Sequence, residues 1–292
     1  MYKRARQVKR TGRRIPGFKP SKGMGQNFLT DRQAAVKMVE IISPEPDEMI
    51  LEIGPGQGAL TRVLLDAGAR VHGVEYDERL FRFLGQEFEG SGKFTAACQD
   101  ILTFDLGDFT RETGQAGIRV VGNLPYLISH RILQWLVSGA KCIPEAFITL
   151  QKEVAQRLLA RPNTKEYGPV TITTACFYTT HKQMSLPAGY FSPRPKVGST
   201  FLKLARQDKE TGQITDTILL FDLVRQSFRQ RRKMLNNNLT GWQVAGSTLD
   251  AQAVRGLEEK SGISFSRRAE SLTRQEFITL SNVLHEYQHA SK

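Results

Sequence analysis

The segment Glu52-Ile53-Gly54-Pro55-Gly56-Gln57-Gly58-Ala59 carries three glycines between a short apolar run and a helical pattern. Glycines there let the backbone approach a ligand, because no Cβ stands in the way. Glu75 ends the next apolar run, 21 positions after Gly54, where a carboxylate can accept hydrogen bonds from both ribose hydroxyls. Asp100 follows the third run, where it could bind an adenine amino group or cap the next segment. Gly54, Gly56 and Glu75 thus predict a nucleotide-type site, which fits a nicotinamide cofactor as well as S-adenosylmethionine.

The tetrapeptide Asn123-Leu124-Pro125-Tyr126 after the fourth apolar run favours S-adenosylmethionine. Methyl transfer to the exocyclic amine of a purine is difficult, because the nitrogen lone pair is delocalised into the ring. The Asn123 side-chain oxygen and the Leu124 carbonyl can each accept one amine hydrogen, which frees the lone pair, and Pro125 restrains the backbone of Leu124. Tyr126 can stack on the base. Positioning would supply most of the rate enhancement, and no strong base is needed because the methylated amine can release its proton to water.

Further ordered segments agree with one family of enzymes. They are Gly25-Gln26-Asn27-Phe28-Leu29, Glu52-Ile53-Gly54-Pro55-Gly56, Asn123-Leu124-Pro125-Tyr126, Gln151-Lys152-Glu153-Val154, Phe191-Ser192-Pro193-Arg194-Pro195-Lys196-Val197 and Phe228-Arg229-Gln230-Arg231-Arg232-Lys233. In these segments the sequence resembles the KsgA-type small-subunit ribosomal RNA adenine dimethyltransferases, from Gly25 to the C-terminal region. The resemblance implies dimethylation of the N6 amino group of two adjacent adenosines near the 3′ end of small-subunit ribosomal RNA during ribosome biogenesis, with S-adenosylmethionine as cofactor. Leu127 and Gly198 depart from the family pattern.

The resemblance also implies a role for each matching site residue. The implied cofactor-binding residues are Asn27, Leu29, Gly54, Gly56, Glu75, Asp100 and Asn123. The implied catalytic residues are Asn123, Leu124, Pro125, Tyr126 and Phe191. Tyr126 and Phe191 would sandwich an adenine that has been flipped out of its stack. Taken alone, Phe191 could equally be a core aromatic.

Short apolar runs alternate with helical patterns over the first part of the chain, which predicts a doubly wound, mainly parallel sheet. The expected strands are Met49–Ile53, Arg70–Glu75, Phe94–Cys98, Val120–Gly122 and Ala146–Leu150. The expected helices are Leu60–Ala67, Arg79–Phe88, Ile132–Val137 and Val154–Ala160. Thr30 and Gln33 form a capping-box pattern ahead of apolar residues at helical spacing, which predicts an earlier amphipathic helix with Thr30 as its N-cap. With the resemblance, the predicted fold is the Rossmann-like class I methyltransferase sheet.

The pattern changes after Tyr178. Lys182–Leu186 and Ser199–Leu204 read as two strands whose connection is too short for a helical crossover, so they should form an antiparallel terminal hairpin. Helical patterns then appear near Ile218–Leu239, Ala251–Glu259 and Arg274–His285. We therefore expect a basic disordered arm at 1–22, a methyltransferase domain at 23–206 and a small α-helical, RNA-binding domain at 207–292.

The chain carries a net charge of +12, which indicates a polyanionic partner. Residues 1–22 hold nine basic residues and no acid; a targeting sequence or a solvated tail is the alternative to an RNA-binding arm. A second basic cluster is predicted to lie on one helix face and to bind RNA through Arg225, Arg229, Arg231, Arg232 and Lys233. The expected partner is small-subunit ribosomal RNA or a partly assembled small subunit, bound by a monomer.

Composition argues against several classes of protein. The three cysteines and five histidines show no ligand spacing, so we expect no metal site and no disulfide framework. No apolar run approaches the length of a membrane span and no signal peptide is evident, so we expect a soluble, cytoplasmic protein.

Three other functions compete with this interpretation. The large-subunit ribosomal RNA adenine dimethyltransferases of the macrolide-resistance type share the chemistry, but usually carry isoleucine where this chain has Leu124. A ribosome-assembly or transcription factor that has lost catalysis would not need Glu75, Asp100 and Asn123 together. A nicotinamide-dependent oxidoreductase would leave the Asn123 tetrapeptide and the basic cluster unexplained.

Overall fold

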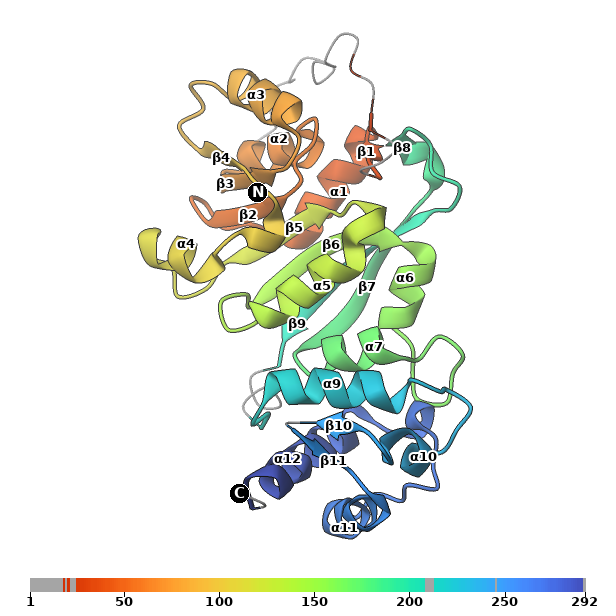
Figure 1. Cartoon of the computed structure of the whole chain (residues 1–292). Helices are drawn as coiled ribbons and strands as arrows, with labels where there is room; N and C mark the ends of the chain where they lie inside the picture. The colour runs from red at the N-terminus through yellow and green to blue at the C-terminus, as the bar shows by residue number, and fades with distance from the viewer. Residues whose placement is uncertain (1–17, 19, 22–24, 208–212, 245, 291–292) are drawn as a thin grey trace. The chain divides into compact units, whose positions relative to one another are not determined.

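The computed structural model describes residues 18, 20–21, 25–207, 213–244 and 246–290 (Figure 1). Its strands are β1 (Phe28–Leu29), β2 (Met49–Ile53), β3 (Arg70–Glu75), β4 (Phe94–Cys98), β5 (Arg119–Asn123), β6 (Glu145–Gln151), β7 (Tyr178–Leu186), β8 (Phe191–Ser192), β9 (Ser199–Arg206), β10 (Gln243–Val244) and β11 (Ser247–Thr248). Its α-helices are α1 (Arg32–Ile42), α2 (Ala59–Asp66), α3 (Glu78–Glu87), α4 (Leu106–Glu112), α5 (Ser129–Ser138), α6 (Lys152–Leu158), α7 (Pro169–Ala175), α9 (Thr217–Ser227), α10 (Leu235–Leu239), α11 (Ala251–Ser261) and α12 (Arg274–Ala290).

The central sheet has seven strands in the order β4-β3-β2-β5-β6-β9-β7. Strands β4, β3, β2 and β5 run parallel, and Ile53 lies beside both Val74 and Gly122. This register brings the residues that follow β2, β3 and β5 to one edge of the sheet, where open α/β sheets bind ligands. The predicted α/β fold with a doubly wound sheet is therefore confirmed.

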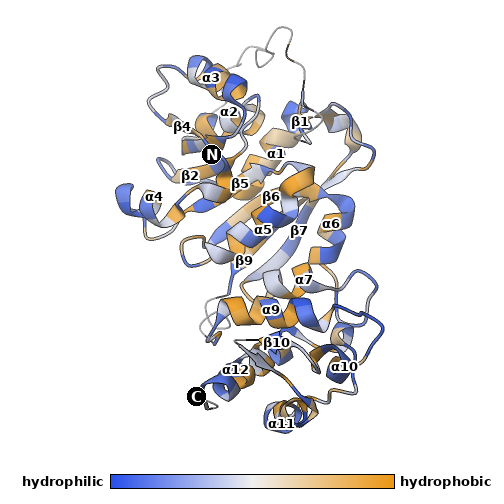
Figure 2. Cartoon of the chain, in the orientation of Figure 1, coloured by the Kyte–Doolittle hydropathy of each residue, from blue (hydrophilic) through white to orange (hydrophobic). Residues whose placement is uncertain are grey.

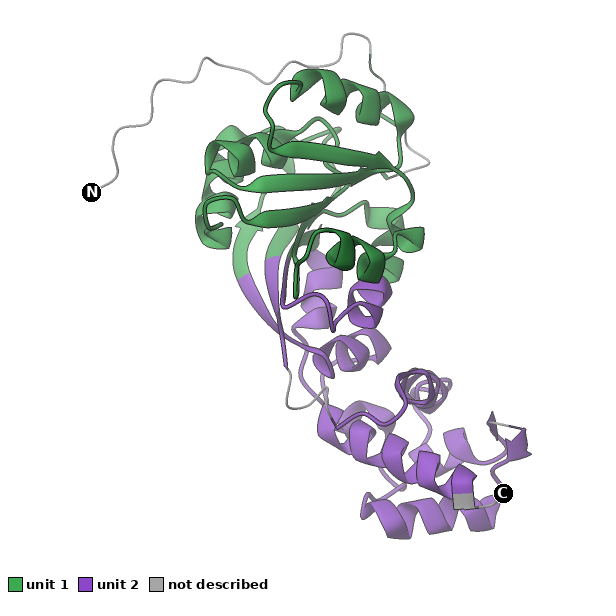
Figure 3. Cartoon of the chain, turned by 90° about the vertical axis from the view of Figure 1, so that its left-hand side faces the viewer, with its two compact units in different colours: residues 1–132, 147–150, 183–201 green, residues 133–146, 151–182, 202–292 purple. Residues whose placement is uncertain are grey.

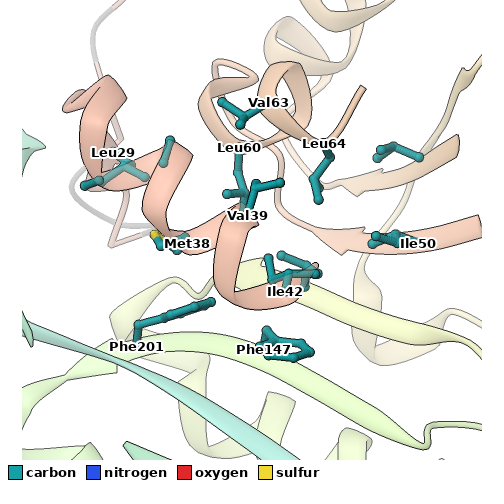
Figure 4. Close-up of a cluster of buried hydrophobic side chains, with 14 of the residues drawn as sticks. Leu29, Met38, Val39, Ile42, Ile50, Leu60, Val63, Leu64, Phe147 and Phe201 are labelled. Atoms are coloured by element: carbon teal, nitrogen blue, oxygen red, sulfur yellow. The ribbon is translucent and has the colours of Figure 1, made fainter. Parts of the chain in front are cut away.

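The central apolar runs form strands with mostly buried side chains, whereas β4, at the sheet edge, has none that is buried. Strands β2, β3 and β4 have the predicted bounds, and the β2 residues Ile50 and Leu51 are fully buried. Helices that flank such a sheet bury one face only, and α3 and α5 accordingly carry both hydrophilic and hydrophobic residues in Figure 2. Figure 4 shows the resulting core, in which Met38 and Ile42 of α1 gather with Phe147 of β6.

The second half of the sheet contains the expected terminal pair. Strands β7 and β9 are neighbours at the sheet edge, and β7 begins at Tyr178, four residues before the predicted start. The segment between them also forms β8, which pairs antiparallel with β1. Sequence patterns did not predict β1, β8, α4 or α7; a two-residue strand is too short to show a period.

The predicted start of the first helix is wrong by one residue. Asp31 is the N-cap of α1, and its carboxylate accepts a hydrogen bond from the Ala34 backbone N–H at 2.7 Å. The Thr30 hydroxyl instead donates to the Tyr190 carbonyl at 3.1 Å. Thr30 is recruited by a residue far away in the sequence, so the adjacent aspartate caps the helix.

The helix predicted across Ile218–Leu239 is interrupted. Helix α9 ends at Ser227, a turn follows, and α10 begins at Leu235. Only Arg225 of the basic cluster lies on a helix, so the predicted shared helix face is wrong. The Arg231 guanidinium holds the turn, because it binds Glu270 at 2.7 Å and donates to the carbonyls of Thr164 and Lys165.

The residues pack into two compact units, coloured green and purple in Figure 3. Among the described residues, unit 1 comprises 18, 20–21, 25–132, 147–150 and 183–201, and unit 2 comprises 133–146, 151–182, 202–207, 213–244 and 246–290. The sequence-based boundary between a methyltransferase domain and a helical domain at 206/207 stays a prediction. Of the predicted arm, the structure describes Phe18, Pro20 and Ser21; the remainder lies outside the described residues.

Candidate active site

A cavity of about 270 Å³ opens at the sheet edge in unit 1. Of the predicted site residues, it is lined by Asn27, Leu29, Gly54, Gly56, Glu75, Asp100, Asn123, Leu124 and Pro125. The parallel strands bring together the residues from Gly54 onward, whereas Asn27 and Leu29 belong to the β1 segment, which pairs with β8. Tyr126 and Phe191 are not among the lining residues. The cavity thus joins the predicted cofactor residues to the first three residues of the Asn123 tetrapeptide.

The glycine loop has a backbone that only glycine adopts readily. Gly54 and Gly56 have φ of +60° and +61°. A Cβ at Gly56 would lie 2.9 Å from the Phe28 ring, whereas one at Gly54 would meet no atom within 4 Å. Glycine at position 56 therefore lets Phe28 close one wall of the cavity, in addition to giving a ligand access to the backbone.

The Glu75 carboxylate is held in place by backbone groups. Its Oε2 accepts a hydrogen bond from the Gly56 N–H, and its Oε1 accepts one from the Asp77 N–H, both at 3.0 Å. Burial raises the pKa of Glu75, while these two hydrogen bonds oppose the rise. A carboxylate has about four acceptor positions, so each oxygen retains one for a ligand hydroxyl.

The Asn123 side chain has one partnered and one unpartnered end. Its Nδ2 donates to the Asn27 carbonyl at 2.8 Å. Its Oδ1 is buried and has no hydrogen-bond partner among the described residues. A buried acceptor without a partner is costly, so a native structure usually keeps one for a ligand or a water. The amide orientation follows from the bond to Asn27, because the carbonyl can receive only the amide NH₂.

Asn27 and Asp100 also present polar groups at the cavity. The Asn27 Nδ2 donates to the Gly25 carbonyl at 3.1 Å. Asp100 Oδ1 accepts from the Leu102 N–H at 3.0 Å and so caps the short 3₁₀ helix Ile101–Thr103. Both interpretations of Asp100 are thus compatible, since a cap uses one carboxylate oxygen and leaves the other for a donor.

The two aromatic residues of the predicted sandwich have different surroundings. The Tyr126 hydroxyl lies 2.7 Å from the Ser199 hydroxyl, and burial raises the pKa of this half-buried phenol. Phe191 is only 4% exposed and packs in the core cluster with Leu29, Leu186 and Phe201. Its ring is covered in this structure, so the sandwich stays a prediction that requires the ring to be uncovered.

Glu52 and Tyr76 are among the lining residues that were not predicted as site residues from the sequence. Glu52 is buried, its Oε2 accepts a hydrogen bond from the Thr61 hydroxyl at 2.6 Å, and burial raises its pKa to about 7. Tyr76, which follows Glu75, is 64% exposed at the cavity. Their positions next to Ile53 and Glu75 at strand ends were the available signal.

The residues of the basic cluster lie in unit 2. Arg225 pairs with Asp222 at 2.8 Å, and Arg231 is engaged by Glu270. Arg229, Arg232 and Lys233 are exposed, and none of these three side chains has a hydrogen bond or an ion pair within the described part of the chain. Exposed, unpaired cations are the ones that can bind phosphate.

The sequence matches the family described as Ribosomal RNA adenine dimethylase over residues 17–286. The chain belongs to this family. Its relatives in the dimethylase family include Ribosomal RNA small subunit methyltransferase A of Bacillus thuringiensis and of Bacillus cereus. Each is 36% identical to it over 270 residues, which cover 92% of this chain and 92% of the relative.

Two solved structures resemble this dimethylase in fold. A dimethyladenosine transferase from Plasmodium falciparum has a TM-score of 0.74 and 22% identity, and covers 90% of this chain and 98% of its own. The 23S rRNA methyltransferase ErmE has a TM-score of 0.61 and 24% identity, and covers 89% of this chain and 100% of its own.

This dimethylase family member is an enzyme, with S-adenosylmethionine as the expected cofactor. Within the described ranges, no group of three or more potential ligands could hold a metal ion. A search of the same residues found no helix with the length and apolar character that crossing a bilayer requires.

Proposed function

We propose that the protein dimethylates the N6 amino group of two adjacent adenosines near the 3′ end of small-subunit ribosomal RNA, during ribosome biogenesis. The relatives whose names specify a small-subunit methyltransferase support this substrate. The substrate is naked RNA or a partly assembled particle, and the protein acts as a monomer.

The observation that carries the proposal is the buried, unpartnered Oδ1 of Asn123 at the cavity. An acceptor there can bind one amine hydrogen, and the Leu124 carbonyl, which Pro125 orients, can bind the other. Two such hydrogen bonds draw the nitrogen toward tetrahedral geometry and free its lone pair. Nearby, the Leu124 N–H donates to the Thr149 carbonyl at 3.2 Å, which anchors the motif to β6.

The cofactor-binding residues fit a charged nucleoside. S-adenosylmethionine supplies the methyl group when it is bound. The Glu75 carboxylate would accept hydrogen bonds from the ribose, and the free oxygen of Asp100 would accept one from the adenine amino group. The cavity walls at Leu29 and Leu124 are apolar, and both side chains are buried. These walls would exclude water from the transfer step.

RNA binding would use the exposed cations Arg229, Arg232 and Lys233 of the predicted C-terminal domain at 207–292. The arm at 1–22, with nine basic residues, would add contacts that depend on salt rather than on sequence. Tyr126, which lies beside the cavity residue Pro125, would stack on the flipped adenine.

The decisive experiment supplies labelled S-adenosylmethionine with unmethylated small or large ribosomal subunits and maps the label. We expect label on two adjacent adenosines of small-subunit RNA. Label on large-subunit RNA alone would instead favour the macrolide-resistance type of dimethyltransferase. Tight binding to small subunits without any transfer would favour an assembly factor that has lost catalysis.

A further inference from the structure

Asp77, the second residue after Glu75, makes more contacts than a helix cap requires. It is 5% exposed, and its Oδ1 accepts from the Arg79 N–H at 3.0 Å, which caps α3. The Arg79 guanidinium binds both carboxylate oxygens, at 2.9 Å and 2.6 Å. That bond holds the pKa of Asp77 below its ordinary value. Oδ2 also accepts a hydrogen bond from the Gln26 Nε2 at 3.2 Å.

The contact with Gln26 connects Asp77 to the predicted catalytic side chain of Asn123. Gln26 is fixed at both ends, because its Oε1 accepts from the Ser21 N–H at 2.8 Å while its Nε2 faces Asp77. The next residue is Asn27, whose carbonyl receives the Asn123 Nδ2. The two ends of an amide side chain have nearly the same shape, so this carbonyl decides which end faces the cavity.

The backbone of Asp77 contacts the predicted cofactor-binding residue Glu75. Its N–H donates to Glu75 Oε1, the predicted ribose ligand. Asp77 is therefore joined to the cofactor side through its backbone and to the acceptor side through its side chain. The two links can be separated experimentally, because a substitution removes the side chain and leaves the N–H in place.

We propose that Asp77 is a positioning residue for methyl transfer: through Gln26 and the Asn27 carbonyl it holds the Asn123 amide with its oxygen toward the substrate amine. This inference rests on the proposed function. Asp77 does not touch the reacting atoms, so it acts on the rate of transfer through Asn123.

The test compares three variants. Asp77→Ser retains an acceptor for the cap of α3 but removes the oxygen that holds Gln26. Gln26→Leu removes the same link from the other side and leaves the cap intact. Asp105→Ser is the control, because Asp105 is exposed and caps α4 through the Asp108 N–H at 2.8 Å, and it does not line the cavity. All three are measured for thermal unfolding, cofactor affinity by calorimetry and single-turnover transfer at saturating cofactor.

We expect Asp77→Ser and Gln26→Leu each to slow transfer about tenfold, which is the size of effect expected when a charge-assisted hydrogen bond is removed, with a much smaller change in cofactor affinity. The double variant should be no slower than the worse single variant, because both break one chain of contacts. Asp105→Ser should transfer at the wild-type rate, with a loss of thermal stability no larger than that of Asp77→Ser, which also gives up the bond to the Arg79 guanidinium.

Two outcomes would overturn the inference. One is transfer by Asp77→Ser within twofold of the wild-type rate. The other is a double variant slower by the product of the single effects, which would make the two residues independent. Failure of the proposed function looks different, since the wild-type protein would then transfer no methyl group to small-subunit RNA.

Discussion

At the residue scale, Asn123 shows how one side chain can be both fixed and available. Its NH₂ end is committed to the Asn27 carbonyl, and its oxygen end is buried without a partner among the described residues. Such an arrangement is costly in the free protein, because the acceptor has given up water. The cost is offset when a donor from a ligand or a water binds the oxygen, so a substrate N–H placed there would be held.

Asn123→Ala should therefore slow single-turnover methyl transfer by roughly a hundredfold, the size of effect seen when one preorganised hydrogen bond to a reacting group is removed. Cofactor affinity should change far less, because the amide oxygen is proposed to bind the acceptor amine. Rapid-quench measurements at saturating cofactor would show this, with calorimetry for the cofactor. Transfer that stays within a few fold of wild type would refute the lone-pair argument.

Glu52 gives a pH-dependent prediction. Burial raises its pKa from 4.5 to about 7, and the neighbouring Glu75 reinforces the rise. The pKa of Glu52 is higher in the folded than in the unfolded protein. The contribution of the Glu52 carboxyl to the free energy of unfolding is therefore most favourable below about pH 4.5, and it is lost as the pH rises through 7. Glu52→Gln should therefore raise the free energy of unfolding more at pH 8 than at pH 5, with a difference of roughly 2–3 kcal/mol.

Urea unfolding of the ligand-free protein at both pH values measures the Glu52 effect. Glu78→Gln is a suitable control, because Glu78 is exposed and pairs with Arg82 at 2.5 Å on the surface of α3. Equal gains for Glu52→Gln at pH 5 and pH 8 would mean that this carboxyl is ionised in the folded protein at both values.

At the element scale, caps and short strand pairs determine where the site residues lie. Strand β1 contributes Phe28 and Leu29 to the cavity wall, and it is held by two residues of β8. Helix α1 begins shortly after β1, so its first turn fixes the end of the same segment. Small changes in these elements should be measurable as changes in stability.

The α1 cap provides a direct check of the corrected helix start. Asp31→Ala should lower the free energy of unfolding by about 1 kcal/mol, because the Ala34 N–H would have no partner. Gln33 is exposed on the first turn of the same helix, so Gln33→Ala should change the free energy of unfolding by less than about 0.5 kcal/mol. Urea titration measures the free energy of unfolding of both variants. A larger loss for Gln33→Ala than for Asp31→Ala would support the predicted capping box of Thr30 and Gln33.

Phe191 in β8 tests whether a covered ring can also bind a base. Phe191→Ala should cost roughly 3–5 kcal/mol of stability, as expected for a core phenylalanine. Phe191→Leu should keep most of the packing, with a cost under about 1.5 kcal/mol, but would remove a stacking surface worth about 1–3 kcal/mol. Wild-type transfer rates in a folded Phe191→Leu protein would remove the residue from the sandwich and leave it in the core.

At the scale of the whole molecule, some basic residues account for the net charge and others hold the fold together. The net charge of +12 is concentrated in the first 22 residues. In the basic cluster, Arg225 and Arg231 pair with acidic residues, and the side chains of the other members have no partner among the described residues. Arg231 joins Glu270 to the carbonyls of Thr164 and Lys165, so it links separate segments of unit 2. The Arg231 guanidinium therefore stabilises the structure of unit 2.

The cluster predicts opposite phenotypes for neighbouring arginines. Arg231→Ala should lower the thermal midpoint and affect RNA binding through loss of folded structure. Arg232→Ala and Lys233→Ala should leave the midpoint unchanged and flatten the dependence of log affinity on log salt by roughly 0.7–0.9 for each phosphate that the variant no longer neutralises. Fluorescence anisotropy with small-subunit RNA across salt concentrations measures this slope. Arg255→Ala, an exposed cation on α11, is the control; an equal flattening of the slope there would show that the cluster has no special role.

Much of the fold could be predicted because its information is local. The bounds of β2, β3 and β4 follow from short apolar runs that alternate with helical patterns, which is a local signal. The glycine loop and Glu75 could be placed on one sheet edge, because parallel strands end side by side. The tetrapeptide beginning at Asn123 indicated the chemistry by its residue types alone.

Other features depended on contacts between distant residues, which a local pattern does not contain. Gln26 meets Asp77 across 51 positions, and Asn123 meets the Asn27 carbonyl across 96. The sequence by itself therefore determined the parallel strands, the glycine loop and the tetrapeptide that begins at Asn123. The tertiary structure decided the cap at Asp31, the burial of Phe191 and the end of α9 at Ser227. The physical reason is that caps, burial and helix ends are settled by which distant groups compete for the same hydrogen bonds and the same core volume.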